Sequence, residues 1–188
     1  MKNYLLVFLF ALCVNQLHAQ HFLDYFDKAH IITDHDTIAC YVKVQGTYHA
    51  KFEYKLHRDA DTLVANIDTV NYLITDFNSY GKIRPNNKSI LSRIICWGKI
   101  NYYARIQFAS PKLIRGDHQN GVSKTDDWTT YYIEKQDTLI AVPKRKVAQK
   151  IAFLFDDDLK SLTKVMKMNK LNNEKLITII ENYNQGKQ

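Results

Sequence analysis

A change of hydrophobic period at Pro143 is the feature that most constrains the fold. From about Asp34 to Val142, apolar and polar residues alternate with period two, and Tyr, Ile, Val and Thr are frequent. This pattern is typical of half-buried β-strands. After Pro143 the apolar residues recur at helical spacing. Strands followed by helices predict an α+β fold, with an antiparallel β-sheet or partly open β-barrel or roll over residues 34–142 and two or three C-terminal helices packed on it.

Turn signals divide the β region into strands and loops. The clearest strand is residues 100–108, in which alternate side chains face opposite sides of the sheet. Short segments at 97–99 and 135–137 predict hairpin turns, so we expect neighbouring strands to be antiparallel. Clusters of Pro, Gly, Asn and Asp at 81–88 and 110–127 predict long exposed loops, which often carry functional residues.

Three amphipathic helical segments are predicted in the tail, over residues 144–184. The first is expected to bury Val147, Ile151, Leu154 and Phe155. The second begins at Leu159 after the acidic triplet 156–158, and the third follows Asn172; these Asp and Asn residues favour helix caps. We expect the apolar stripes to pack on the chain's own sheet rather than on a membrane or a partner helix.

The first nineteen residues are predicted to form a secretory signal peptide. Lys2 precedes an apolar run over residues 5–14, and Ala19 supplies the small residue before the cleavage point. This run is well short of the ~20 residues that a transmembrane helix needs. We therefore expect cleavage after Ala19 and export to the periplasm, the outer-membrane surface or the medium. The mature chain, residues 20–188, is expected to be a single domain without a transmembrane span.

The charge balance is basic, and export changes what that implies. The chain carries a formal net charge of +7, and removal of the signal peptide takes away one lysine and no acidic residue. Because an exported protein rarely meets nucleic acid, no nucleic-acid partner is expected. Acidic envelope surfaces and polysaccharides are the expected partners of a basic exported protein.

Two cysteines remain after cleavage, because Cys13 lies in the signal peptide. Cys40 and Cys96 are a candidate disulfide, since disulfides persist outside the cytoplasm. The alternative is two separate thiols buried as small apolar side chains, because both residues lie within apolar strand-like runs. The sequence leaves both readings open, since it does not give the distance between the two residues.

A short motif, Asp-Thr-aliphatic, occurs four times, each where a turn passes into a strand. It resembles the acceptor sequence for protein O-glycosylation in exported proteins of Bacteroidota. On that resemblance, the candidate modification sites are Thr37, Thr62, Thr69 and Thr138. The alternative is local chemistry, in which Asp caps a turn through its side chain and Thr begins a strand.

No segment carries the motif of a known reaction. The sequence lacks H-E-x-x-H and C-x-x-C metal motifs, a Gly-x-Ser-x-Gly nucleophile turn and glycine-rich phosphate loops. We therefore assign no catalytic, metal-binding or cofactor-binding residue and expect no cofactor. One catalytic alternative is an envelope hydrolase with a site built from His49, His57 and loop carboxylates.

Aromatic residues are the remaining candidates for ligand contact, because exposed rings stack on sugars or peptides. The candidates in or beside strands are Trp97, Tyr103, Trp128 and Tyr131. The alternative is that these rings pack under the C-terminal helices. The leading hypothesis is an exported, non-catalytic binding or structural module of the cell envelope, which holds an envelope component, a glycan or a peptide.

Four features of the chain together resemble small exported proteins of Bacteroidota that pair a β-rich region with a helical C-terminal tail. They are the leader, the strand entry 36–38, the hairpin from Tyr131 to Lys144, and the closing segment 179–184 with its Tyr-Asn pair. The chain departs from that group at His35, where a Gly often precedes Asp-Thr. The resemblance implies a compartment and a fold and carries no activity.

Overall fold

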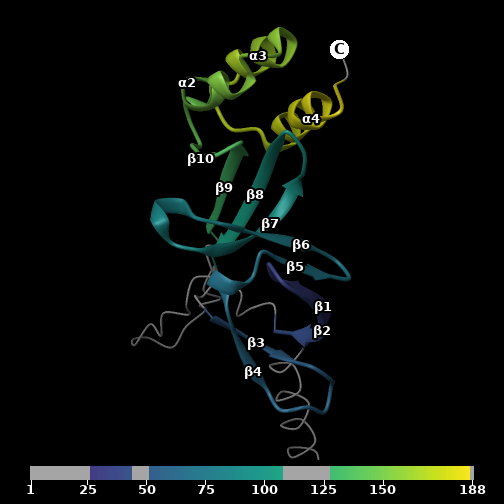
Figure 1. The fold of residues 1–188 in the computed structure, drawn as a ribbon. Coiled ribbons are helices and arrows are strands. Elements are labelled where there is room, and N and C mark those ends of the chain that lie inside the picture. Colours follow the sequence, from purple (N-terminus) through teal and green to yellow (C-terminus); the bar gives the residue numbers. More distant parts are fainter. Residues whose placement is uncertain (1–25, 44–50, 108–127, 187–188) are drawn as a thin grey trace, which may run out of the picture.

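The computed structural model describes residues 26–43, 51–107 and 128–186. It has an α+β fold, in which a ten-stranded antiparallel sheet is followed by three α-helices (Figure 1). The sheet remains open, and its spatial order is β10-β9-β8-β7-β6-β5-β1-β2-β3-β4. The sequence prediction of fold class is therefore confirmed, with the open sheet as the form that the chain adopts. His49 lies outside the described residues, as do the predicted signal peptide over residues 1–19 and the predicted loop over 110–127.

Neighbouring strands pair antiparallel throughout the described sheet, mostly through short connections. The strands are β1 (Asp27–Ile32), β2 (Thr37–Val42), β3 (Lys51–Lys55), β4 (Leu63–Asn66), β5 (Tyr72–Thr75), β6 (Ser79–Ile83), β7 (Ile90–Cys96), β8 (Ile100–Gln107), β9 (Trp128–Lys135) and β10 (Thr138–Val142). Two short 3-10 turns, η2 (Ile67–Thr69) and η3 (Pro85–Asn87), connect strands. The hairpin turns predicted at 97–99 and 135–137 are confirmed, since they join β7 to β8 and β9 to β10.

The strand region differs from the prediction at two places. It begins earlier, at Asp27, because Ala29 and Ile31 of β1 are buried between β2 and β5. The loop predicted over 81–88 is too long: Gly81 is buried within β6, and only the segment around η3 connects β6 to β7. Glycine as a residue type favours a loop, but Gly81 lies within a strand and makes room for the ring of Tyr103.

The helical layer is close to its prediction. It consists of α2 (Val147–Ile151), the 3-10 turn η4 (Ala152–Phe155), α3 (Leu159–Met166) and α4 (Asn173–Asn184). The first predicted helix is split because Ile151 leaves the helical region, with φ −123° and ψ −6°. Asp158 caps α3 and Asn172 caps α4 through side chains that accept backbone N–H groups, as expected. The helix α4 contacts β7 and β8, and α2 contacts β10.

Three clusters of buried side chains form the core. The helix-side core lies between the helices and β7–β10 and contains Cys96, Ile100, Tyr102, Ile133, Val142, Val147, Ile151, Leu154, Phe155, Val165, Met168, Leu176, Ile179, Ile180 and Tyr183. The N-terminal core, on β1–β7, contains Ala29, Ile31, Cys40, Val42, Phe52, Ile67, Val70, Leu73, Tyr80 and Leu91. A small third cluster contains Ile83, Ile90, Tyr103 and Tyr132. The Tyr103 side chain lies on the face of β8 opposite the helical layer. Because this side chain is buried too, both faces of β8 are covered, whereas the alternation in its sequence predicts one exposed face.

The disulfide considered for Cys40 and Cys96 is not formed. Both residues are buried free thiols, in the N-terminal core and the helix-side core respectively. Their strands β2 and β7 are separated in the sheet by β1, β5 and β6. Four interstrand spacings of about 4.8 Å each far exceed the ~7 Å between Cα atoms that a disulfide tolerates. The alternative of two separately buried thiols is therefore correct.

Candidate functional site

An apolar pocket of about 440 Å³ opens on one face of the sheet. It is formed mainly by β1, β5, β6 and β7. Its lining residues are Ile32, Tyr72, Ile74, Phe77, Asn78, Ser79, Ile94, Ile95 and Trp97. Strand pairing explains this set, because Ile32 lies opposite Tyr72 and Ile74 opposite Ser79, so their side chains share one face.

Two exposed aromatic side chains belong to the lining. The Trp97 side chain, which directly follows β7, is 57% exposed, and Phe77 is 79% exposed. The ring of Tyr72 meets that of Trp97 edge to face, with centroids 5.5 Å apart and planes at 76°. This contact orients the indole while it leaves much of its surface accessible, which suits stacking against a ligand.

The turn between β5 and β6 places Phe77 beside the pocket. The hydroxyl oxygen of Thr75 accepts the N–H groups of Phe77 at 3.3 Å and Asn78 at 3.0 Å, and the Thr75 N–H donates to the Asn78 carbonyl at 2.8 Å. These bonds close the turn around a residue that points its large ring away from the core. A phenylalanine inside the polar turn Thr-Asp-Phe-Asn is the sequence signal that could have indicated this site.

The pocket's chemistry favours a neutral ligand. None of the lining side chains that the structure describes carries a charge, and Asn78 and Ser79 add neutral hydrogen-bonding groups to the mostly apolar surface. An apolar group can therefore enter without leaving a charge unpaired. Among the described lining residues there is no His, Cys, Asp, Glu or Lys, and the side-chain hydroxyls are those of Tyr72 and Ser79.

The four predicted ligand-contact residues have different environments. Trp97 lines the pocket, and its contact with a ligand stays a prediction. Tyr131 stacks on Tyr102 with centroids 5.6 Å apart and packs against the helix-side core, so the alternative of packing under the helices holds for it. Trp128 begins β9, but its side chain lies outside the described residues.

Tyr103 is buried and serves the core beside the pocket. It is 3% exposed, and its hydroxyl donates to Glu134 Oε2 at 2.7 Å. Burial, together with this bond, raises the pKa of the Tyr103 hydroxyl above its ordinary value. A Cβ atom on Gly81 would lie 3.2 Å from Tyr103 Cε1, so the glycine lets the ring pack against the β6 backbone. The ring therefore supports the strands around Ile94 rather than contacting a ligand.

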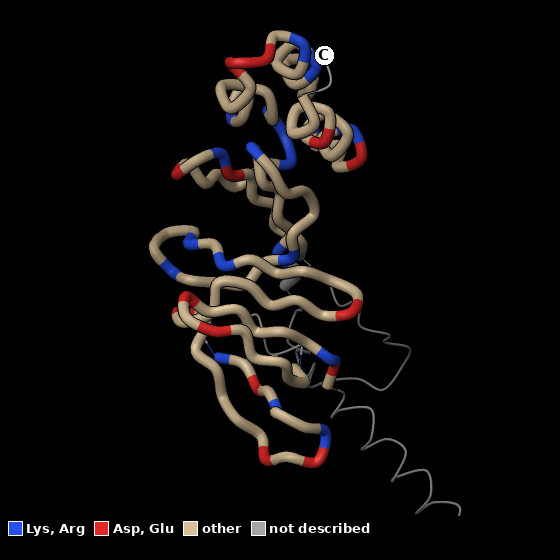
Figure 2. Tube along the Cα trace, turned by 45° about the vertical axis from the view of Figure 1, so that its right-hand side comes forward, with Lys and Arg blue, Asp and Glu red and all other residues tan. Residues whose placement is uncertain are grey.

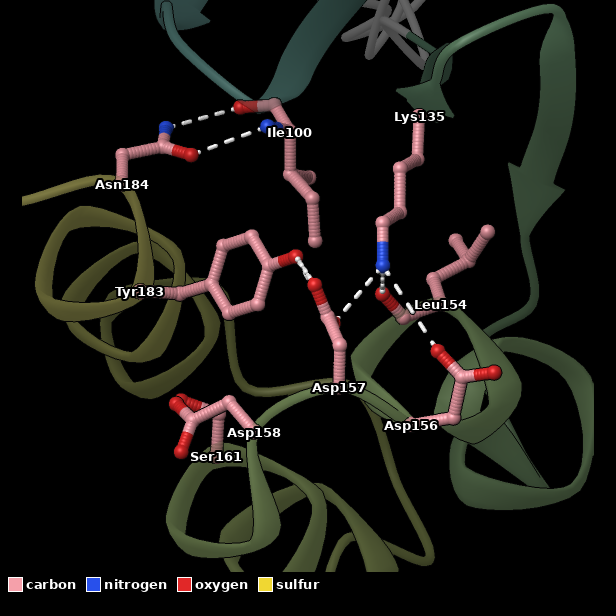
Figure 3. Close-up of polar contacts among 9 residues, drawn as sticks. All are labelled: Ile100, Lys135, Leu154, Asp156, Asp157, Asp158, Ser161, Tyr183 and Asn184. Atoms are coloured by element: carbon pink, nitrogen blue, oxygen red, sulfur yellow. Dashed lines mark hydrogen bonds and ion pairs between the residues drawn. The ribbon is translucent and has the colours of Figure 1, made fainter. Parts of the chain in front are cut away.

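A second group of polar side chains, the Lys135 cluster, joins the end of β9 to the helical layer (Figure 3). Lys135 Nζ donates to the Leu154 carbonyl and to Asp157 Oδ1, each at 2.8 Å, and lies 3.7 Å from Asp156 Oδ1. The Tyr183 hydroxyl donates to the Asp157 carboxylate at 2.7 Å. One lysine and one carboxylate thus connect a strand, the segment before α3, and α4.

The protonation states of the Lys135 cluster are fixed at neutral pH. Hydrogen bonds from Lys135 and then from Tyr183 hold the pKa of Asp157 below its ordinary value. Burial opposes the charge of Lys135, but the bond to Asp157 and the neighbouring Tyr183 outweigh it, so the pKa of Lys135 is raised. Burial also raises the pKa of Tyr183. Lys135, Asp157 and Tyr183 therefore keep their ordinary charge states near pH 7. Their contacts hold the helices on the sheet.

The alternative of an envelope hydrolase stays a prediction, because His49 and the segment 110–127 lie outside the described residues. His57 is exposed in the turn between β3 and β4. Across residues 26–43, 51–107 and 128–186, no three or more His, Cys, Asp and Glu side chains group closely enough to hold a metal ion.

The four threonines of the Asp-Thr-aliphatic motif are all exposed. Asp36 Oδ1 accepts the Thr37 N–H at 2.7 Å, which is the turn chemistry considered as the alternative to modification. The Thr69 hydroxyl donates to the Asn66 carbonyl at 2.8 Å. Solvent therefore reaches each candidate site, and at Thr37 the adjacent aspartate also has a local structural role.

Comparisons with protein-family models, curated proteins and solved structures found no match to this chain. Among the helices that the structure describes, none combines the length and apolar character needed to cross a membrane.

Proposed function

We propose that this protein is an exported, non-catalytic binding module of the cell envelope and that the pocket beside Trp97 is its ligand site. The observation that carries the proposal is an open, uncharged pocket whose lining includes two aromatic side chains exposed to solvent. Large exposed apolar groups gathered at one place on a soluble fold favour a binding surface.

The proposed ligand presents a neutral, apolar or planar group. A side chain of an envelope peptide or the apolar face of a sugar would stack on Trp97 and Phe77 and fill the space over Ile74 and Ile94. The Asn78 amide and the Ser79 hydroxyl would supply hydrogen bonds at the edge. The leader over residues 1–19 supports the envelope as the place where such a ligand is met.

The ligand site is tested with a neutral aromatic dye, N-phenyl-1-naphthylamine, whose emission rises when it leaves water. We expect the protein to bind the dye and Trp97→Ala to bind it at least tenfold more weakly, because the variant loses most of one wall. Phe153→Ala is the matched control, since Phe153 is 55% exposed and lies in η4, outside the pocket lining. Equal dye affinity in the wild type and Trp97→Ala would refute the site, and far-ultraviolet circular dichroism checks that each variant is folded.

Export is tested separately by the mass of the protein isolated from its native host. The proposal expects a chain that begins at Gln20. Additional mass on peptides that contain Thr37, Thr62, Thr69 or Thr138 would establish glycosylation. A chain that still carries residues 1–19 in the host would contradict export by a cleaved leader.

A further inference from the structure

The helix α3 presents large apolar side chains to solvent. Leu159 is 77% exposed and Met166 is 61% exposed, and their spacing of seven residues places them on the same side of the helix. The opposite side of α3 is buried through Ser161 and Val165. Since most apolar side chains of a helix face its own core, a second apolar side directed at solvent needs a separate explanation.

The position of α3 makes this surface accessible. It packs on α2, η4 and α4 rather than on the sheet, and Figure 1 shows it at the end of the molecule that the helices form. Phe153 of η4, the element that directly precedes α3, is also 55% exposed. We call Phe153, Leu159 and Met166, together with the lysines 160, 164 and 167, the helical tip.

Basic residues outnumber acidic ones in the segment that contains α2, η4 and α3, and Figure 2 shows both kinds on this part of the molecule. Residues 144–170 contain eight basic side chains and three acidic ones, which leaves five of the chain's net +7 charges in this segment. The basic residues are Lys144, Arg145, Lys146, Lys150, Lys160, Lys164, Lys167 and Lys170, and the acidic residues are Asp156, Asp157 and Asp158. All three acids are engaged within the protein, because Asp156 and Asp157 pair with Lys135 and Asp158 caps α3.

Helical geometry places lysines beside the exposed apolar side chains. At 100° per residue, Lys160 and Lys167 lie roughly 80–100° around α3 from Leu159. Both lysines are exposed, and their aliphatic stems can lie along an apolar surface while the ammonium groups reach outward. The helical tip thus combines protruding apolar groups with positive charges along one side of them.

We propose that the helical tip docks on an anionic phospholipid surface. Leu159, Met166 and Phe153 insert to the depth of the headgroups, and the lysines interact with the lipid phosphates. Apolar insertion and electrostatic attraction are the two signals that stable attachment of a peripheral protein to a membrane requires. This inference goes beyond the ligand-binding proposal, because the helical tip shares no residue with the pocket.

Vesicle sedimentation tests the proposal on the chain that begins at Gln20, because an apolar leader would bind lipid by itself. This chain retains every described helix and strand, all of which lie within residues 27–184. We expect it to sediment with vesicles of equal parts phosphatidylglycerol and phosphatidylcholine, but not with phosphatidylcholine alone. Added salt is expected to weaken the binding.

Two variants separate the contributions of charge and apolar insertion. K160Q/K164Q/K167Q is expected to lower vesicle affinity on the order of a hundredfold, at about fivefold for each lysine. L159S/M166S is expected to lower it at least tenfold, because both exposed side chains lose their apolar surface. Circular dichroism is expected to show an unchanged fold, since Leu159 and Met166 are exposed.

The matched control removes the same charge elsewhere. K28Q/K51Q/K88Q changes three exposed lysines outside the helical layer and is expected to keep most of the vesicle affinity. Equal losses in the two triple-lysine variants would mean that net charge alone drives binding, and would overturn the proposal. Binding to soluble heparin together with unchanged vesicle binding by L159S/M166S would instead assign the surface to a polyanion and overturn it as well.

Discussion

Replacement of Lys135 by methionine tests whether the Lys135 cluster holds the helices on the sheet. Methionine keeps the apolar stem of the side chain and removes its ammonium group. The variant loses the hydrogen bond from Nζ to the Leu154 carbonyl and the bond to Asp157, both 2.8 Å long in the wild type. The ion pair with Asp156, 3.7 Å long in the wild type, is lost as well.

The expected loss of stability follows from the exposure of the partners. A hydrogen bond that involves a charged group contributes about 1.5–3 kcal/mol. The bond to the Leu154 carbonyl is placed in that range because the Lys135 side chain is only 17% exposed. The Asp157 side chain is 56% exposed, so water replaces much of its interaction and the ion pair adds at most about 1 kcal/mol. We therefore expect Lys135→Met to lower the free energy of unfolding by about 2–3 kcal/mol.

The penalty has a defined pH dependence. The folded-state pKa of Asp157 is lowered, so its stabilisation is complete above the unfolded value of about 3.9 and is lost as the pH falls through the folded value. The folded-state pKa of Lys135 is raised, so its stabilisation is complete below about 10.4 and is lost as the pH rises through the folded value. The penalty of Lys135→Met is therefore constant from about pH 5 to pH 9 and smaller at pH 3.

Urea unfolding followed by circular dichroism at pH 7 and pH 3 measures the penalty. With a slope of about 2 kcal/mol per molar urea for a chain of this size, the midpoint of Lys135→Met is expected to fall by about 1–1.5 M at pH 7. Lys175→Met is the control, because Lys175 is exposed on α4. A midpoint change no larger than that of the control, or a penalty at pH 3 as large as at pH 7, would refute the assigned role of Lys135.

Three further predictions concern the contacts around β7 and β8. Asn184→Ala is expected to lower the free energy of unfolding, measured with urea, by roughly 2–4 kcal/mol, because the Asn184 amide bonds both the N–H and the carbonyl of buried Ile100, at 2.9 and 2.8 Å. A loss below about 1 kcal/mol would contradict this prediction. Gly98→Ala is expected to lower the free energy of unfolding by a similar amount, since the new Cβ would lie 2.6 Å from Asn184 Cγ. Its effect is expected to be non-additive with that of Asn184→Ala, and full additivity would contradict this coupling. Burial raises the pKa of the Cys40 and Cys96 thiols to about 11, so iodoacetamide at pH 8 is expected to label both thiols only after the protein unfolds. Mass spectrometry counts the labels, and rapid labelling of the folded protein would contradict the burial of the two thiols.

Local signals explain the part of the fold that could be predicted. The period change at Pro143, the hairpin turns at 97–99 and 135–137, and the caps at Asp158 and Asn172 all depend on neighbouring residues in the chain. The break within the first helix at Ile151 could not be predicted, because no residue in that segment forbids a helix. At this break η4 contacts α2 and α3, and local preferences do not encode such tertiary contacts.

The candidate site could be predicted only in part. Trp97 and Tyr103 are both candidates because they are aromatic residues in or beside strands, and only Trp97 is exposed. The Tyr103 ring lies in the core, where Gly81, two strands away, accommodates it. Phe77 and Tyr72 were missed, because their place at the pocket depends on which strands are neighbours.

By itself, the sequence determined the fold class, the change from strands to helices and the hairpin turns at 97–99 and 135–137, because these depend on side-chain period and turn chemistry over short distances. Only the tertiary structure decided that β1 lies between β2 and β5, that Cys40 and Cys96 lie in separate cores, and that a pocket opens beside Trp97. These features depend on pairings between segments far apart in the chain. Local preferences do not encode such pairings, since their free energy comes from surfaces that meet only after folding.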